Sequence, residues 1–172
     1  MARLSHLSRR FFTSLAPGGP SAANREWVAS QLTDAEFELW SHMSGPDRRH
    51  SVTVARRVER SLGDEATREV VAAALMHDVG KSVAGLRTYG RVIATVSAAF
   101  AGHDMALRWC QARGFVRRVG LYLRHPELGG DLLAMAESHP LTVAWTREHH
   151  LPPDSWTVPA HIGETLKACD DD

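Results

Sequence analysis

Residues 70–81 read Val-Val-Ala-Ala-Ala-Leu-Met-His-Asp-Val-Gly-Lys, and this stretch carries the strongest structural signal in the chain. Its unbroken apolar run predicts a buried helix, which we expect Asp64 to cap and which should continue to Asp78 and end at Gly80. His77 and Asp78 close that run. Burying an imidazole and a carboxylate is costly unless something binds them, so this dipeptide is the first candidate for a functional site.

Helical patterns continue on both sides of this stretch. Thr33 to Glu36 form a capping-box pattern that opens a helix, and Val54 and Val58 repeat at a spacing of four in a helix expected over Asp47 to Leu62. Further helices are expected over residues 24–32, 86–100, 104–113, 115–124, 126–135, 138–149 and 159–170. We expect Asp104 to be an N-cap. Because no strand pattern stands out, the chain is predicted to be an all-α, single-domain helical bundle.

The composition fits one globular domain. The chain has 172 residues, of which 44% are apolar, enough for one core but short for two. Residues 16–21 are rich in proline and glycine, so residues 1–22 are expected to form an N-terminal arm and linker and residues 23–172 the helical domain. The arm mixes arginines with leucines and phenylalanines, which is typical either of a frayed helical arm or of an amphipathic surface helix. No segment resembles a signal peptide or a membrane span.

The formal net charge is +0, which disfavours a helical bundle that binds DNA or an anionic membrane through overall charge. The two cysteines, Cys110 and Cys169, form neither a disulfide framework nor a zinc-ribbon spacing. We therefore expect a reducing, cytoplasmic compartment.

Ten histidines stand out in this neutral chain. Any single histidine is more often solvated or hydrogen-bonded than bound to a metal. However, His50 lies one turn before Val54 on the apolar stripe, and Asp170 extends the stripe of Ile162 and Leu166. Neutral imidazoles and carboxylates on inward faces suit a divalent transition metal, with Mn, Fe, Ni or Co favoured over Mg.

The order of His50, His77-Asp78-x-x-Lys81 and a late aspartate resembles the HD superfamily of metal-dependent phosphohydrolases. His125-Pro126-x-x-x-Gly130 and a later histidine pair resemble the additional histidines of its HD-GYP subgroup. Residues 149–159 align without gaps with the HHExxDGxGYP stretch of that subgroup. They keep the histidine pair, the aspartate and the final proline, and the subgroup's glycines and tyrosine are replaced by Ser155, Thr157 and Val158.

The resemblance implies a site with one or two metal ions. One ion would be held by His50, His77, Asp78 and Asp170. A second ion would share Asp78 and be held by His125, His149 and His150. Catalysis would depend on Asp78 and Lys81, with metal-activated water attacking phosphorus and Lys81 holding a phosphoryl oxygen or helping the leaving group depart. Further phosphate groups would bind Lys81, Arg48, Arg124 and Arg147.

Some assignments have alternatives. Asp170 opens an acidic tail, so Asp171 could be the last ligand instead, and Lys81 could be only a charge at a helix C-terminus. Trp156 could stack on a base or close a loop. The expected function is hydrolysis of a small phosphomonoester or phosphodiester, most simply a nucleotide. The alternative is a catalytically silent HD module that binds a nucleotide or a partner protein in signalling.

Overall fold

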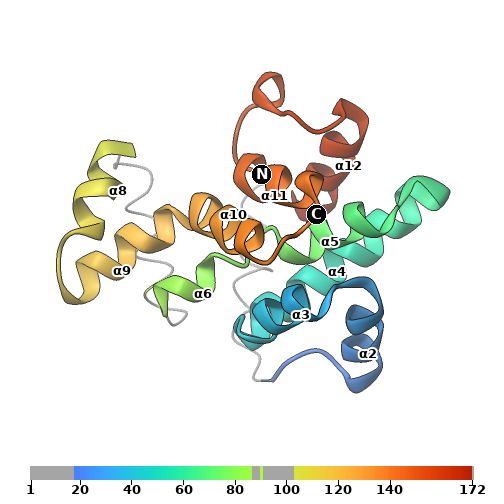
Figure 1. The fold of residues 1–172 in the computed structure, drawn as a ribbon, viewed down its shortest axis with the longest axis horizontal. Helices are drawn as coiled ribbons and strands as arrows, with labels where there is room; N and C mark the ends of the chain where they lie inside the picture. Colours follow the sequence, from blue (N-terminus) through green and yellow to red (C-terminus); the bar gives the residue numbers. More distant parts are fainter. Residues whose placement is uncertain (1–17, 87–89, 91–102, 172) are drawn as a thin grey trace, which may run out of the picture.

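The protein is all-α. The computed structural model describes residues 18–86, 90 and 103–171, and these residues form helices and turns without a β-strand (Figure 1). Residues 1–17 of the predicted arm lie outside the described part of the chain, as does nearly all of the helix predicted over residues 86–100. The elements in chain order are α2 (Ala22–Gln31), α3 (Asp34–Ser41), α4 (Gly45–Leu62), η1 (Gly63–Glu65), α5 (Arg68–Met76), α6 (Lys81–Ala84), α8 (His103–Cys110), α9 (Gly114–Leu123), α10 (His125–Met135), α11 (Pro140–Glu148), η2 (Pro153–Ser155) and α12 (Ala160–Asp171).

The core is built around α5. Every side chain from Val70 to Met76 is buried, because α5 packs against α2, α3, α4 and α11. The predicted stripe on α4 faces this core through Val54 and Val58. On the other side, α12 packs along α4. The last helix therefore lies beside a helix that begins more than a hundred residues earlier, which brings Asp170 close to His50.

A second, smaller apolar cluster joins α6 to α9. Its buried members are Ala84, Leu86, Val119 and Leu121. Helix α8 packs on α9, and a Cβ atom added at Gly120 would lie 2.6 Å from the backbone nitrogen of Cys110. Glycine thus permits a close crossing of the two helices. Figure 1 shows the α8–α9 pair at one end of the long axis, away from the core around α5.

The all-α prediction is confirmed, whereas several helix boundaries differ from the sequence expectation. The capping box at Thr33 and Glu36 is present. Asp64 does not cap α5: it lies in η1, and Thr67 is the N-cap residue. Helix α5 ends at Met76, so Asp78 lies in a turn. Asp104 lies in the first turn of α8, which begins one residue earlier than predicted.

Candidate metal centre

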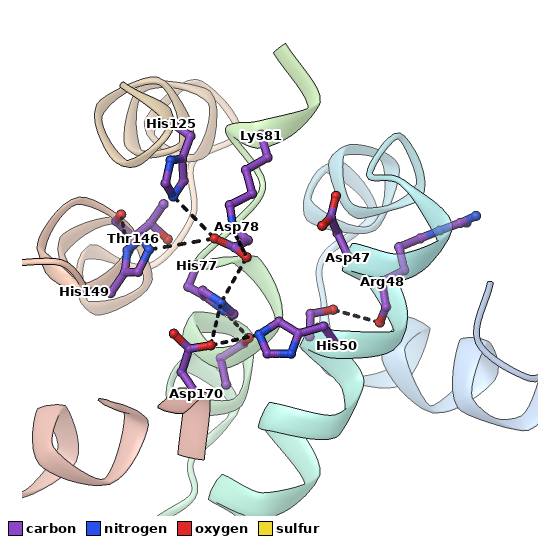
Figure 2. A network of polar contacts seen from close by, with 12 residues as sticks. Asp47, Arg48, His50, His77, Asp78, Lys81, His125, Thr146, His149 and Asp170 are labelled. Carbon is purple, nitrogen blue, oxygen red and sulfur yellow. Dashed lines mark hydrogen bonds and ion pairs between the residues drawn. The ribbon is translucent and has the colours of Figure 1, made fainter. Parts of the chain in front are cut away.

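The turn after α5 presents Asp78 to four surrounding helices. Residues 77–80 form this turn, and a Cβ atom added at Gly80 would lie 2.0 Å from the carbonyl oxygen of His125 and 2.6 Å from the backbone nitrogen of Gly129. Only glycine allows the turn to approach α10 so closely. As a result, the buried Asp78 carboxylate lies between His77 on one side and His125 and His149 on the other (Figure 2).

One group of ligand candidates, which we call the carboxylate side, consists of His50, His77 and Asp170. His50 Nε2 lies 2.8 Å from Asp170 Oδ1. His77 Nε2 lies 3.5 Å from the same oxygen and 3.4 Å from Asp78 Oδ2. Asp170 is buried, whereas Asp171 is exposed and lies 3.4 Å from Lys167. The structure therefore brings Asp170, and not Asp171, into the cluster.

The other group, which we call the imidazole side, consists of His125, His149 and His150. Their candidate ligand atoms lie within 4.8 Å of one another. His125 Nε2 is 3.4 Å and His149 Nε2 is 3.8 Å from Asp78 Oδ1. The two oxygens of Asp78 thus face different sides, because Oδ2 is next to His77.

Three of these histidines are held in the orientation that a metal ion requires. The Nδ1 atoms of His77, His125 and His149 lie 2.8–2.9 Å from the carbonyl oxygens of Ala74, Tyr122 and Thr146, each three residues earlier. A carbonyl oxygen can only accept a hydrogen bond, so each Nδ1 carries the hydrogen and each Nε2 faces Asp78. Metal-ligating histidines are commonly fixed in this way by a hydrogen bond from the other ring nitrogen.

The same three Nε2 atoms are buried and make no hydrogen bond, which is rare for buried polar atoms. Two ligand atoms bound to one ion at about 2.1 Å lie roughly 3.0–3.5 Å apart in tetrahedral or octahedral geometry. The spacing of 3.4 Å between Asp78 and both His77 and His125 falls in this range. The residues therefore fit a divalent metal on each side of Asp78.

The electrostatics differ between the two sides. Burial, together with neighbouring cationic groups, lowers the pKa values of His125 and His149. Partial burial and the neighbouring His125 lower the pKa of His150 to about 4, although its edge reaches solvent. Burial also disfavours charge on His77, but Asp78 and Asp170 outweigh it and raise its pKa to about 10. Neutral imidazoles are ready to bind metal, whereas His77 must first lose a proton.

Lys81 is the first residue of the four-residue helix α6, and it does not end α5, which closes at Met76. Its Nζ atom lies 2.5 Å from Asp78 Oδ2. Burial would lower the pKa of Lys81, but Asp78, Tyr122 and Asp47 together raise it. Sequence reasoning missed Asp47 and Tyr122. Asp47 could have been noticed as a carboxylate one turn before His50, and Tyr122 as the residue three before His125.

The three arginines predicted to bind phosphate have other contacts. The Arg48 guanidinium carbon lies 5.6 Å from the Trp40 ring centroid, and its side chain points away from Asp78 in Figure 2. Arg124 pairs with Glu127 at 2.5 Å, and Arg147 pairs with Asp131 at 2.9 Å. Their role in phosphate binding stays a prediction.

Trp156 closes the loop that follows the histidine pair. Its indole nitrogen donates hydrogen bonds to the carbonyl oxygens of Glu148 and Leu151, each at 3.1 Å. Its ring packs edge-on against Trp145, with 5.4 Å between centroids. Of the two alternatives for this residue, the structure shows the loop-closing one.

No family model, curated protein or solved structure matches this chain. Within the part of the chain that the structure describes, no helix is long and apolar enough to cross a membrane.

Proposed function

We propose that the chain is a metal-dependent phosphohydrolase of the HD type, with two divalent transition-metal ions that share Asp78. The observation that carries this proposal is the set of three buried Nε2 atoms that face Asp78 without making a hydrogen bond. A structural cluster of histidines would satisfy these atoms with hydrogen bonds. The order of residues along the chain, which resembles the HD superfamily, supports the same assignment.

The ions, when bound, would activate water and neutralise charge on the phosphoryl oxygens. The chain's own residues hold the reactants. Asp78 has its pKa held well below the usual range, mainly by Lys81 and His77 acting against the cost of burial, so it stays ionised and able to bind two cations. Lys81 is charged and half-buried at the edge of the cluster. Its ammonium group can donate a hydrogen bond to a phosphoryl oxygen or to the departing oxygen.

The cluster is open to solvent next to His50, Lys81 and His150, which are less buried than the other ligand candidates. A small phosphorylated substrate, such as a nucleotide, would enter on this side. Cys110 and Cys169 form no disulfide with each other in the described part of the chain, in keeping with a reducing, cytoplasmic compartment.

The first test is metal content, measured by mass spectrometry on protein purified anaerobically without chelators. We expect about two equivalents in the wild type and about one in His125→Ala, because the imidazole side loses a ligand. A matched control is His161→Ala, which removes an exposed histidine that pairs with Glu65 and should keep both equivalents. Absence of metal from the wild type would contradict the proposal.

Activity is tested separately on the metal-loaded protein with a panel of nucleotide monoesters, cyclic dinucleotides and aryl phosphates. Turnover that depends on Asp78 supports a phosphohydrolase. Full metal content without turnover of any phosphoester would favour the catalytically silent module. Equal turnover in wild type and Asp78→Asn would exclude catalysis at this site.

A further inference from the structure

The α8–α9 hairpin carries an unusual combination of exposed side chains. Where α9 begins, Phe115 and Val116 are 47% and 44% exposed. They are followed at once by Arg117 and Arg118, and Arg113 precedes them; all three arginines are exposed. Two large apolar side chains thus lie in the first turn of one helix with cations on both sides. We call residues 113–118 the hairpin patch.

The region around the hairpin patch is positively charged, although the formal net charge of the whole chain is +0. Residues 105–118 contain four arginines and no aspartate or glutamate, in a chain whose formal net charge is +0. The rest of the chain therefore has an equal excess of negative charge. Among the described residues, Arg108, Arg113, Arg117 and Arg118 form no ion pair, whereas Arg124, a few residues later, pairs with Glu127. The argument from net charge against anionic partners therefore does not apply to residues 105–118.

The arginines of the hairpin patch also lie near the N-terminus of α9, where a positive charge does not stabilise a helix. The first turn of α9 contains no acidic residue, and no side chain caps its N-terminus. Helices α2, α6, α11 and α12 likewise lack an acidic residue there, whereas α3, α4, α5, α8 and α10 each have one. Because cations are unfavourable near a helix N-terminus, these arginines do not serve the stability of α9. An anionic partner bound at these arginines would offset their unfavourable interaction with the N-terminus of α9.

We infer that the hairpin patch docks the protein on an anionic lipid surface, with Phe115 and Val116 inserted among the lipids and the arginines bound to phosphate headgroups. Exposed apolar side chains next to arginines are the pattern of interfacial binding, whereas a site for nucleic-acid phosphates alone gains nothing from exposed phenylalanine and valine. The hairpin lies at one end of the molecule's long axis (Figure 1). A hairpin at the end of the molecule can contact a flat lipid surface, whereas a peptide ligand would need a groove.

The inference is independent of the metal centre. Hairpin geometry depends on α8 packing on α9 through Gly120, and the hairpin patch includes none of the proposed metal ligands. The cytoplasmic leaflet carries anionic lipids and attracts clustered arginines with about 1 kcal/mol each, which corresponds to about fivefold in binding for each arginine.

The test is flotation of the full-length protein with two kinds of vesicle, one of phosphatidylcholine alone and one with about 30% phosphatidylglycerol. We expect binding to the anionic vesicles only, decreasing as salt is added. Arg117→Gln/Arg118→Gln should weaken it roughly twentyfold, and Phe115→Ser on the order of tenfold. Circular dichroism and metal content should stay unchanged in both variants.

Two controls match these variants. Arg25→Gln/Arg60→Gln removes the same charge from exposed positions on α2 and α4, and Met135→Ser removes an exposed apolar side chain from α10. Neither should change vesicle binding. Equal binding to both vesicle types, equal loss in the control variants, or binding to duplex DNA in place of vesicles would each overturn the inference, the last in favour of a nucleic-acid surface.

Discussion

The carboxylate side and the imidazole side of Asp78 differ in how their buried polar groups are stabilised. On the carboxylate side, Asp170 bonds to His50, and two carboxylates hold a proton on His77. On the imidazole side, the pKa values of all three histidines are lowered, and two of their Nε2 atoms are buried without a partner. On the carboxylate side, a proton on His77 can therefore offset the charge of the two carboxylates without metal, whereas the neutral histidines of the imidazole side have no proton to direct from Nε2 at Asp78. This difference predicts that a bound metal would contribute more to stability on the imidazole side.

The two sides also differ in how the chain assembles them. The imidazole side comes from the start of α10 and from the turn directly after α11, two helices that follow one another in sequence and pack together. The carboxylate side joins His50 to Asp170 across 120 residues. Its geometry thus depends on α12 reaching α4, while the imidazole side depends on the close contact between Gly80 and α10. Variants can be chosen to damage one side and spare the other.

The largest effect is expected from Asp78→Asn, because Asp78 is the only residue shared by both sides. The amide has one oxygen and no negative charge, so both ions should bind poorly. We expect metal content to fall toward zero and turnover to fall roughly a thousandfold or more. Stopped assays of turnover, together with mass spectrometry of the metal content, measure both quantities. Loss of one ion only would show that the two sides do not share Asp78.

Gly80→Ala should separate the two sides. The new methyl group would lie 2.0 Å from the His125 carbonyl oxygen, so the turn and α10 must move apart at a cost of about 2–3 kcal/mol. We expect loss of the metal equivalent on the imidazole side and retention of the other. Gly85→Ala is the control. It also replaces a glycine, one with φ of 58° and no atom within 4 Å of the new Cβ, and it should cost about 1 kcal/mol with both ions kept.

The number of protons released on metal binding should differ between the two sides. His77 has its pKa raised from 6.5 to about 10, so the charge on His77 stabilises the metal-free protein below pH 6.5, and this stability is lost as pH rises through 10. A metal on the carboxylate side must displace that proton, so its affinity should rise about tenfold per pH unit over this window. Titration calorimetry of His125→Ala in two buffers should give about one proton released per ion at pH 8. His50→Ala, which keeps the imidazole side, should release close to none, and equal proton release in both variants would contradict the comparison.

Local patterns in the sequence predicted His50, His77, Asp78 and Asp170 as ligand candidates, whereas His125, His149 and His150 were proposed from the family resemblance. The apolar run before His77 and the stripe through Ile162 to Asp170 place these side chains inward without knowledge of the fold. Sequence reasoning was wrong where two local capping patterns compete, and it missed ion-pair partners that come from distant segments. Thr67 and not Asp64 begins α5 because η1 intervenes, and the pairing of Arg147 with Asp131 follows from the packing of α10 on α11. The shared position of Asp78 could be proposed only by resemblance, since it depends on how the helices pack.

The smallest effect we predict tests whether loop closure by Trp156 supports the imidazole side. Trp156→Phe removes the donor to the carbonyl oxygens of Glu148 and Leu151, which flank the histidine pair, at a cost of about 1 kcal/mol. Thr33→Ala breaks the capping box of α3 at a similar cost, about 1 kcal/mol, far along the chain from these ligands. Both variants should unfold at similarly lower denaturant concentrations. Only Trp156→Phe should also weaken metal binding on the imidazole side, because His149 and His150 would lose part of their support. Equal metal affinity in the two variants would mean that packing against Trp145 alone holds the loop in place.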